Sequence, residues 1–326
     1  MNKFCFFIVL TVLLSCKKEP VLSIDSLIMS NPEDKEGEVI EIDTVLIAAF
    51  KSKSLIDFYE ARENETVWQS EKNRKIILET IRKCEDEGLN PSDYNVVKLE
   101  SFEKKFSELD EEELIDYDLQ LTYNFEKYLK HLHNGKLNPR KLYNDWDLRI
   151  DELDTKSILN NALEKDSLMG EIEKCQPKAL TYGKLIKALE LINEFPEDKT
   201  QPIVSEDKIE HNQKHREIIN IKKKLIYWKD LKSNDSLTST YDDETFEAVK
   251  KFQTRHGLIS DGVIGKSTKT AFNFTKEERK HQIIVNLERW RWFSKSFAPN
   301  YVLINIPDYS LNVVENQNIT MTKRIV

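Results

Sequence analysis

The stretch from Tyr241 to Phe274 constrains the fold of this chain more than any other, because helix signals and turn signals alternate in it at short intervals. Asp242 or Asp243 can accept hydrogen bonds from the free N–H groups of a first helical turn. Apolar residues then recur on one helical face, at Phe246, Val249 and Phe252. Gly257 follows and predicts a left-handed stop at the end of this helix.

The same stretch predicts a second helix, and the residues before it predict a third. Asp261-Gly262 is typical of a turn, and Ser267 can begin a short helix. Upstream, apolar residues occur at steps of three and four, at Ile218, Ile221, Leu225 and Trp228. The sequence therefore predicts three short helices around one small core.

The order A-V-x-x-F-Q-x-x-H-G-L-x-x-D-G-x-x-G-x-x-T, from Ala248 to Thr268, resembles the peptidoglycan-binding module attached to many cell-wall enzymes. The resemblance implies such a module over residues 213–275. Sugars offer hydroxyls to polar side chains and apolar faces to rings. We therefore expect the exposed polar and aromatic groups around its turns to bind the polymer, namely Tyr241, Gln253, His256 and Asp261. The alternative is that these positions only build the core and turns of the bundle.

Charge and glycine content exclude other classes of partner. The net charge is −8, and the long Lys/Arg runs of a nucleic-acid-binding surface are absent from the sequence. With eight glycines and no G-x-x-x-x-G-K-[ST] motif, no nucleotide cofactor is predicted. His211 and His215 lie four residues apart without an H-E-x-x-H motif, so we predict no metal site.

The first sixteen residues are typical of a targeting signal. Lys3 precedes an apolar run, Phe4 to Leu14, that is too short to span a bilayer as a stable helix. The run ends in Leu-Leu-Ser-Cys, which resembles a bacterial lipoprotein box. The resemblance implies a signal peptide over residues 1–15 and a lipid on Cys16. A short transmembrane segment or an ordinary secretory signal is the alternative. Residues 16–50 are mostly polar and predict a tether between the lipid and the first folded domain.

Residues 51–200 predict a helical domain. Apolar residues recur at helical spacing, and Gly88 and Gly135 mark two helix ends. The order F-Y-x-x-R then Trp68, then G-L-x-P-x-x-Y from Gly88, then L-T-x-x-x-x-x-Y-L-x-x-L-x-x-G-K-L-x-P from Leu121, resembles the scaffold domain of large L,D-transpeptidases. That family is similar to this chain in arrangement as well, with a membrane anchor, a helical scaffold, a peptidoglycan-binding module and a catalytic domain.

A further match to that family lies at Asn286–Trp292, N-L-E-R-W-R-W, within a predicted connecting helix over residues 276–297. It resembles the helix that leads into the family's catalytic domain. A packing role for the two tryptophans, with the arginines stacked or ion-paired, is the alternative.

The last part of the chain predicts β-strands. Apolar residues alternate around Val302 and Ile304, again around Leu311 and Val313, and a third strand begins at Ile319. By the resemblance, residues 298–326 are the first strands of an incomplete catalytic domain, and the record of the chain is truncated at its C-terminus. The predicted fold is therefore mainly α: a helical scaffold domain and a three-helix module, ending in an incomplete antiparallel β meander.

The resemblance implies that the full-length protein forms peptide cross-links in peptidoglycan through a cysteine nucleophile. The family's S-x-G-C-x-R stretch does not occur in these 326 residues. We therefore assign no catalytic residue and predict that the chain is inactive alone. Cys84 lies on an apolar helix face and Cys175 precedes Gln-Pro, so both are predicted to be core residues, or paired in a disulfide.

Two other functions stay open: a non-catalytic wall-binding lipoprotein, and a wall hydrolase that uses the same binding module. The expected partners are peptidoglycan and, through the lipid, a membrane. The expected location is a membrane-anchored lipoprotein that faces the periplasm or cell envelope.

Overall fold

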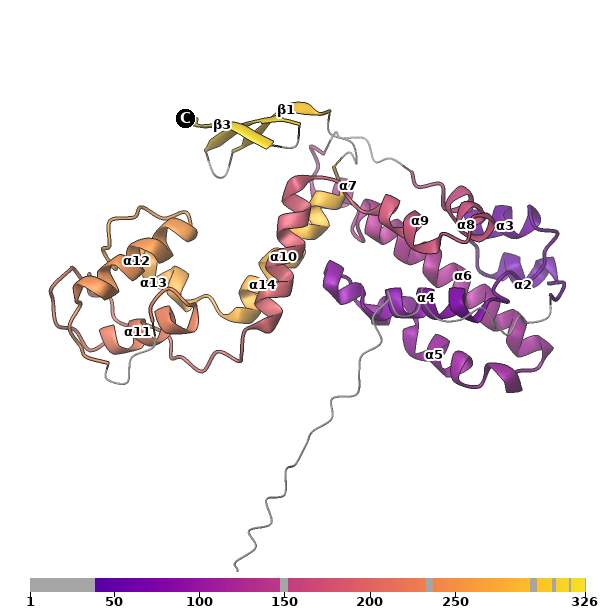
Figure 1. Cartoon of the computed structure of the whole chain (residues 1–326), viewed down its shortest axis with the longest axis horizontal. Coiled ribbons are helices and arrows are strands. Elements are labelled where there is room, and N and C mark those ends of the chain that lie inside the picture. The colour runs from indigo at the N-terminus through magenta and orange to yellow at the C-terminus, as the bar shows by residue number, and fades with distance from the viewer. Residues whose placement is uncertain are drawn as a thin grey trace, which may run out of the picture.

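A computed structural model describes residues 39–146, 152–232, 237–293, 298–306, 309–316 and 318–325. These residues form helices almost throughout, followed by one three-stranded antiparallel sheet, so the predicted fold class is confirmed (Figure 1). Two separate hydrophobic cores organise the helices, the first within residues 42–175 and the second within residues 179–287.

The first core lies around one long helix, α6 (Glu111–Asn134). Asp110 and Glu113 form a capping box that begins α6, and Gly135 ends it as predicted. In this part of the chain, the helices that pack directly against α6 are α4 (Glu71–Arg82), η2 (Pro91–Tyr94), α5 (Val96–Lys104), α8 (Thr155–Glu164) and α9 (Leu168–Cys175) (Figure 1). The other helices of this part of the chain are α2 (Thr44–Ala49), α3 (Lys53–Glu60), η1 (Cys84–Glu87), η3 (Phe106–Glu108) and α7 (Pro139–Leu142).

The end of the predicted tether belongs to this first core. Ile42 and Ile47 are buried in it, and the Ile42 N–H donates to the Asn64 carbonyl at 2.7 Å. The prediction that residues 16–50 are a tether is therefore wrong for residues 39–50, because isoleucines of this segment are buried in the first core. The predicted signal peptide, Cys16 and the tether up to residue 38 lie outside the described residues. Within the described ranges, no helix is both long enough and apolar enough to cross a membrane.

A buried carboxylate ties α6 to the chain before α4. The two oxygens of Asp118 accept hydrogen bonds from the Val67 and Trp68 N–H groups at 2.9 and 2.8 Å and from the Tyr59 hydroxyl at 2.6 Å. The hydroxyl of Thr122 lies 2.7 Å from that of Tyr59. Burial nevertheless raises the pKa of Asp118 from its ordinary value of 3.8 to about 6.

This shift predicts a pH-dependent stability. Because the folded-state pKa of Asp118 is raised, its contribution to stability is fully present below the unfolded pKa and is lost as the pH rises through about 6. The Asp118→Asn variant does not titrate there, and its amide oxygen can still accept from the two N–H groups. Between about pH 4 and pH 7, we expect the wild type to lose about 2–3 kcal/mol of unfolding free energy relative to Asp118→Asn. Urea unfolding across that range tests this, and parallel pH profiles for the two proteins would contradict it.

The second core joins five helices: α10 (Leu180–Glu194), α11 (Ile218–Tyr227), α12 (Asp243–Arg255), α13 (Lys266–Asn273) and α14 (Lys276–Arg291). The three-helix bundle predicted from the sequence corresponds to α11, α12 and α13. Asp242 caps α12 by accepting from the Thr245 N–H at 3.0 Å, as one of the two predicted caps.

Two segments that were predicted to lie outside this bundle contribute to its core. Leu189 of α10, assigned by sequence to the scaffold at 51–200, is fully buried in the second core. The segment between residues 199 and 213 is mostly polar and lies between the two predicted domains, yet it buries Ile203 and Ile209, and the backbones of Ile209 and Ile264 form a bridge. Its two buried isoleucines therefore fix this polar segment to the bundle.

Helices α10 and α14 lie side by side and antiparallel, and the bundle is the connection between them (Figure 1). The Lys276 ammonium at the start of α14 donates to the Phe195 carbonyl just after α10. At the opposite end, Arg291 donates to the Tyr182 hydroxyl near the start of α10. The chain thus leaves the helix pair and returns to it at the same end.

The three predicted strands are confirmed as β1 (Asn300–Asn305), β2 (Ser310–Glu315) and β3 (Asn318–Arg324). They pair in chain order, with Val302 opposite Val313 and Val313 opposite Met321. The alternation of apolar residues predicted an apolar face on β1. On that face the side chains of Val302 and Ile304 are both more than 50% exposed.

Candidate functional site

Two of the four residues predicted to bind the polymer are buried in the bundle. Tyr241 is 0% exposed and its hydroxyl donates to the Gly262 carbonyl at 2.6 Å. Gln253 is 1% exposed. The expectation that these two side chains are exposed is wrong, because both face inward to bond the turn that follows α12.

The side chain of Gln253 organises that turn. Its Nε2 donates to the Asp261 side chain at 3.1 Å and to the Val263 carbonyl at 3.0 Å, while its Oε1 accepts from the Gly262 N–H at 2.8 Å. Gly262 has a φ of +72°, and an added Cβ would lie 2.1 Å from the Phe246 ring. The Phe-Gln and Asp-Gly pairs of the motif therefore belong to one structural unit.

The other two predicted residues are accessible at opposite ends of this turn region. Asp261 is exposed, and its Oδ1 also accepts from the Val263 N–H at 2.8 Å. His256 is half-buried at the end of α12, where its ring lies 4.2 Å from that of Phe252. Asp261 therefore lies with Gln253 and Tyr241 in one turn, whereas the His256 side chain bonds Arg279 of another helix and is not part of that group.

His256 instead meets Arg279, which comes from α14. The Arg279 Nη1 lies 3.2 Å from His256 Nδ1, and because a guanidinium can only donate, Nδ1 must accept. Burial, with Arg279 and Arg255 nearby, lowers the pKa of His256 to about 3, so the ring is neutral with its proton on Nε2. Arg279 also donates to the Ala271 carbonyl at 2.6 Å and lies over the Trp228 ring at 4.9 Å.

Two neighbouring hollows meet at this pair, and together we term them the junction groove. The first, of about 470 Å³, lies between the end of α12, α13 and the start of α14. The second, of about 680 Å³, lies between α10, the end of α11, the end of α12 and α14. Both are lined by His256, Arg279 and Gln282. Sequence reasoning did not find this groove, apart from His256, because it combines helices that are far apart along the chain and no local motif marks it.

Comparison with family models decides what the bundle is. Residues 214–272 match a model described as "Putative peptidoglycan binding domain". Residues 53–189 match a model described as "Scaffold domain".

The chain carries a scaffold domain and a peptidoglycan-binding domain.

This pair of domains is consistent with the L,D-transpeptidase family and supports a cell-wall-binding protein of that type. The comparison with curated proteins returned no match. The peptidoglycan-binding domain begins within the second core, and the scaffold match extends across most of α10. The two matched regions therefore share the second core.

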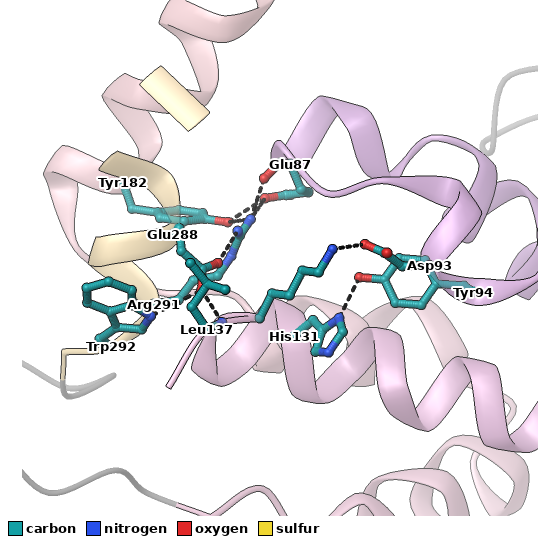
Figure 2. A network of polar contacts seen from close by, with 10 residues as sticks. Glu87, Asp93, Tyr94, His131, Leu137, Tyr182, Glu288, Arg291 and Trp292 are labelled. Carbon is teal, nitrogen blue, oxygen red and sulfur yellow. Dashed lines mark hydrogen bonds and ion pairs between the residues drawn. The ribbon is translucent and has the colours of Figure 1, made fainter. Parts of the chain in front are cut away.

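A polar cluster at the end of α14 joins the scaffold domain to the helix pair (Figure 2). Arg291 is 1% exposed and donates to the Glu87 carbonyl of η1 and, at 2.9 Å, to the Tyr182 hydroxyl of α10. The Tyr182 hydroxyl in turn donates to the Glu87 carboxylate at 2.6 Å. Glu288 lies 3.6 Å from Arg291 and accepts from the Leu137 N–H at 2.7 Å. The ion-paired role considered for the arginines of N-L-E-R-W-R-W is therefore supported for Arg291.

Cys84 and Cys175 are buried and no disulfide joins the two, so the alternative of a Cys84–Cys175 disulfide is wrong. Burial, with Glu85 and Asp93 nearby, raises the pKa of the Cys84 thiol to about 12. The Cys175 thiol donates to the Glu171 carbonyl at 3.4 Å. A thiol that stays protonated at neutral pH is a poor nucleophile, so Cys84 is suited to packing.

Proposed function

We propose that this chain is a peptidoglycan-binding lipoprotein of the L,D-transpeptidase type, which positions the cell wall for peptide cross-linking. The observation that carries the proposal is the joint presence of the scaffold and peptidoglycan-binding domains, packed through one shared core. Such a core fixes a polymer held by the binding domain relative to the scaffold domain.

The proposal includes the location. A lipid on Cys16 would anchor the chain to a membrane, and the chain would face the periplasm or cell envelope. Several acyl chains, at about 0.8 kcal/mol per buried CH₂, give firm anchoring. The polar residues that follow Cys16 would let the scaffold domain reach the wall.

In the proposed reaction a cysteine thiolate attacks a stem-peptide carbonyl, the C–N bond of that peptide breaks, and its amine leaves with a proton while a thioester remains. An amine of a second stem peptide then attacks the thioester, forms the new peptide bond and releases the thiolate. The buried thiols of Cys84 and Cys175 do not suit this role. We therefore propose that residues 1–326 bind the wall and form no cross-links by themselves.

We expect the full chain to co-sediment with purified peptidoglycan, because the matched binding domain is folded within it. Retention in the supernatant at every salt concentration tested would overturn wall binding. The Gly262→Ala variant, whose binding domain we expect to be destabilised, is the negative comparison and should bind less. A digest of the same mixture that contains more cross-linked peptides than a digest of peptidoglycan kept without the protein would overturn the expected inactivity.

A further inference from the structure

The junction groove has the chemistry of a binding site for an anionic peptide. We propose that it takes a carboxylate-bearing stem peptide of peptidoglycan, with its carboxylates between Lys229 on one side and Lys266 on the other. The inference rests on the proposed function and deepens it, because it assigns the peptide part of the polymer, rather than the sugar part, to a site that the binding domain forms with the α10–α14 pair.

The first argument is charge. The lining of the two hollows includes four cationic side chains and no acidic ones among the described residues: Lys229, Arg255, Lys266 and Arg279. This excess stands out in a chain of net charge −8. Arg255 is paired with the buried Asp230, whereas Lys229 and Lys266 are exposed. Burial, more than the nearby Arg255, lowers the pKa of Arg279 to about 10, and an anion that pairs with this guanidinium would offset the cost of its burial.

The second argument is hydrogen bonding. Three buried donors find no partner in the described part of the chain, and all three belong to side chains that line the junction groove: Trp228 Nε1, His256 Nε2 and Arg279 Nε. Native proteins leave few buried donors unsatisfied, so a cluster of them requires an explanation. These three atoms are covered in the structure, and a carboxylate in the groove would give them an acceptor once their side chains rotate toward it.

The third argument is shape. Hollows of about 470 and 680 Å³ suit a short peptide, since small-molecule sites in proteins enclose about 300–1,000 Å³. The larger hollow has apolar walls that include Phe195, Trp228 and Ile283. Its cationic groups therefore lie beside apolar surface, as binding of a peptide with small apolar side chains and free carboxylates requires.

The direct test is calorimetric titration of the full chain with the synthetic dipeptide L-alanyl-γ-D-glutamate, which carries two carboxylates. The matched ligand is the same dipeptide with both carboxylates amidated. We expect the dipeptide to bind and its diamide to bind at least tenfold more weakly. Failure of the dipeptide to bind, or equal binding of the diamide, would overturn the inference.

A test variant reverses the charges of two lysines in the junction groove, and a control variant reverses the charge of one lysine outside it. We expect the double variant Lys229→Glu/Lys266→Glu to lose at least tenfold in dipeptide affinity. Lys223→Glu, an exposed lysine of α11 that is not part of the groove lining, should stay within twofold of wild type. Both lysines of the double variant are exposed, so its unfolding midpoint should match that of the wild type. Should the midpoint fall, Lys229→Gln/Lys266→Gln repeats the test without reversed charges, and unchanged affinity in a folded variant refutes the site.

Sedimentation separates this inference from the proposed function. Peptidoglycan whose stem peptides have been removed by an amidase is compared with intact peptidoglycan. Weaker binding to the stripped polymer supports the junction groove. Equal binding to both polymers, by the wild type and the double variant alike, would leave wall binding standing and remove the stem peptide from the site. Binding to neither polymer would overturn the proposed function itself.

Discussion

Replacing Arg291 with methionine is expected to lower the free energy that holds α14 against the scaffold domain by about 3–5 kcal/mol. Arg291 is almost fully buried, and the carboxylates of Glu87 and Glu288 lie 3.9 and 3.6 Å from it. Both carboxylates are mostly covered, so the substitution leaves two buried charges without their cation. Hydrogen exchange in α14 measures this directly, because exchange reports local opening below the global unfolding free energy.

The matched control lies two residues earlier on the same helix. Arg289 is exposed, and its only recorded polar contact in the described chain is at 3.4 Å with the Tyr143 hydroxyl. Arg289→Met should change the opening free energy by no more than about 0.5 kcal/mol. Equal exchange rates in α14 of the Arg289→Met and Arg291→Met proteins would show that the buried cluster does not hold the helix.

The second large effect is expected at Gly262. Alanine there would keep a φ of +72°, which costs an L-residue about 1–2 kcal/mol, and its Cβ would overlap the Phe246 ring at 2.1 Å. Overpacking of this kind adds about 1–3 kcal/mol. We therefore expect Gly262→Ala to destabilise the peptidoglycan-binding domain by about 3–4 kcal/mol. Urea unfolding followed by circular dichroism would show this as an earlier transition of part of the helical signal.

Gly257 provides the comparison that separates strain from crowding. Its φ of +66° is similar, but an added Cβ would meet nothing within 4 Å. Gly257→Ala should therefore cost only about 1–2 kcal/mol, from backbone strain alone. Similar losses for the two variants would mean that the ring of Phe246 moves aside freely and that the turn is less closely packed than the structure shows.

Local signals predicted the elements well because their causes are local. Each of these signals depends on residues within a few positions of one another. Examples are the helix cap at Asp242, the end of α6 at Gly135 and the alternation of apolar residues around Val302. These signals gave the bundle, the long helix of the scaffold domain and the three strands. The motif resemblance also located the binding domain, because its glycines and its Gln253 are required by a specific turn.

The burial of single side chains and the contacts between residues far apart in the chain could not be predicted from the sequence. Tyr241 and Gln253 look like surface residues from their polarity, but each satisfies its polar atoms inside the bundle. Ile42 lies in a polar stretch and still fills a core position, because one buried isoleucine leaves no periodic pattern to detect. The meeting of His256 with Arg279, 23 positions away, depends on how α14 returns beside α12, which no spacing rule encodes.

The antiparallel pair of α10 and α14 has a mechanical consequence. Both ends of the peptidoglycan-binding domain attach to the same end of this pair, through contacts such as that of Lys276 with Phe195. A pull on wall held by the domain would therefore be divided between two helices. Both helices would have to separate from the scaffold domain before the binding domain came free, whereas a single connecting segment could be pulled away by itself. Tension in the wall would thus reach the scaffold domain through two helices at once.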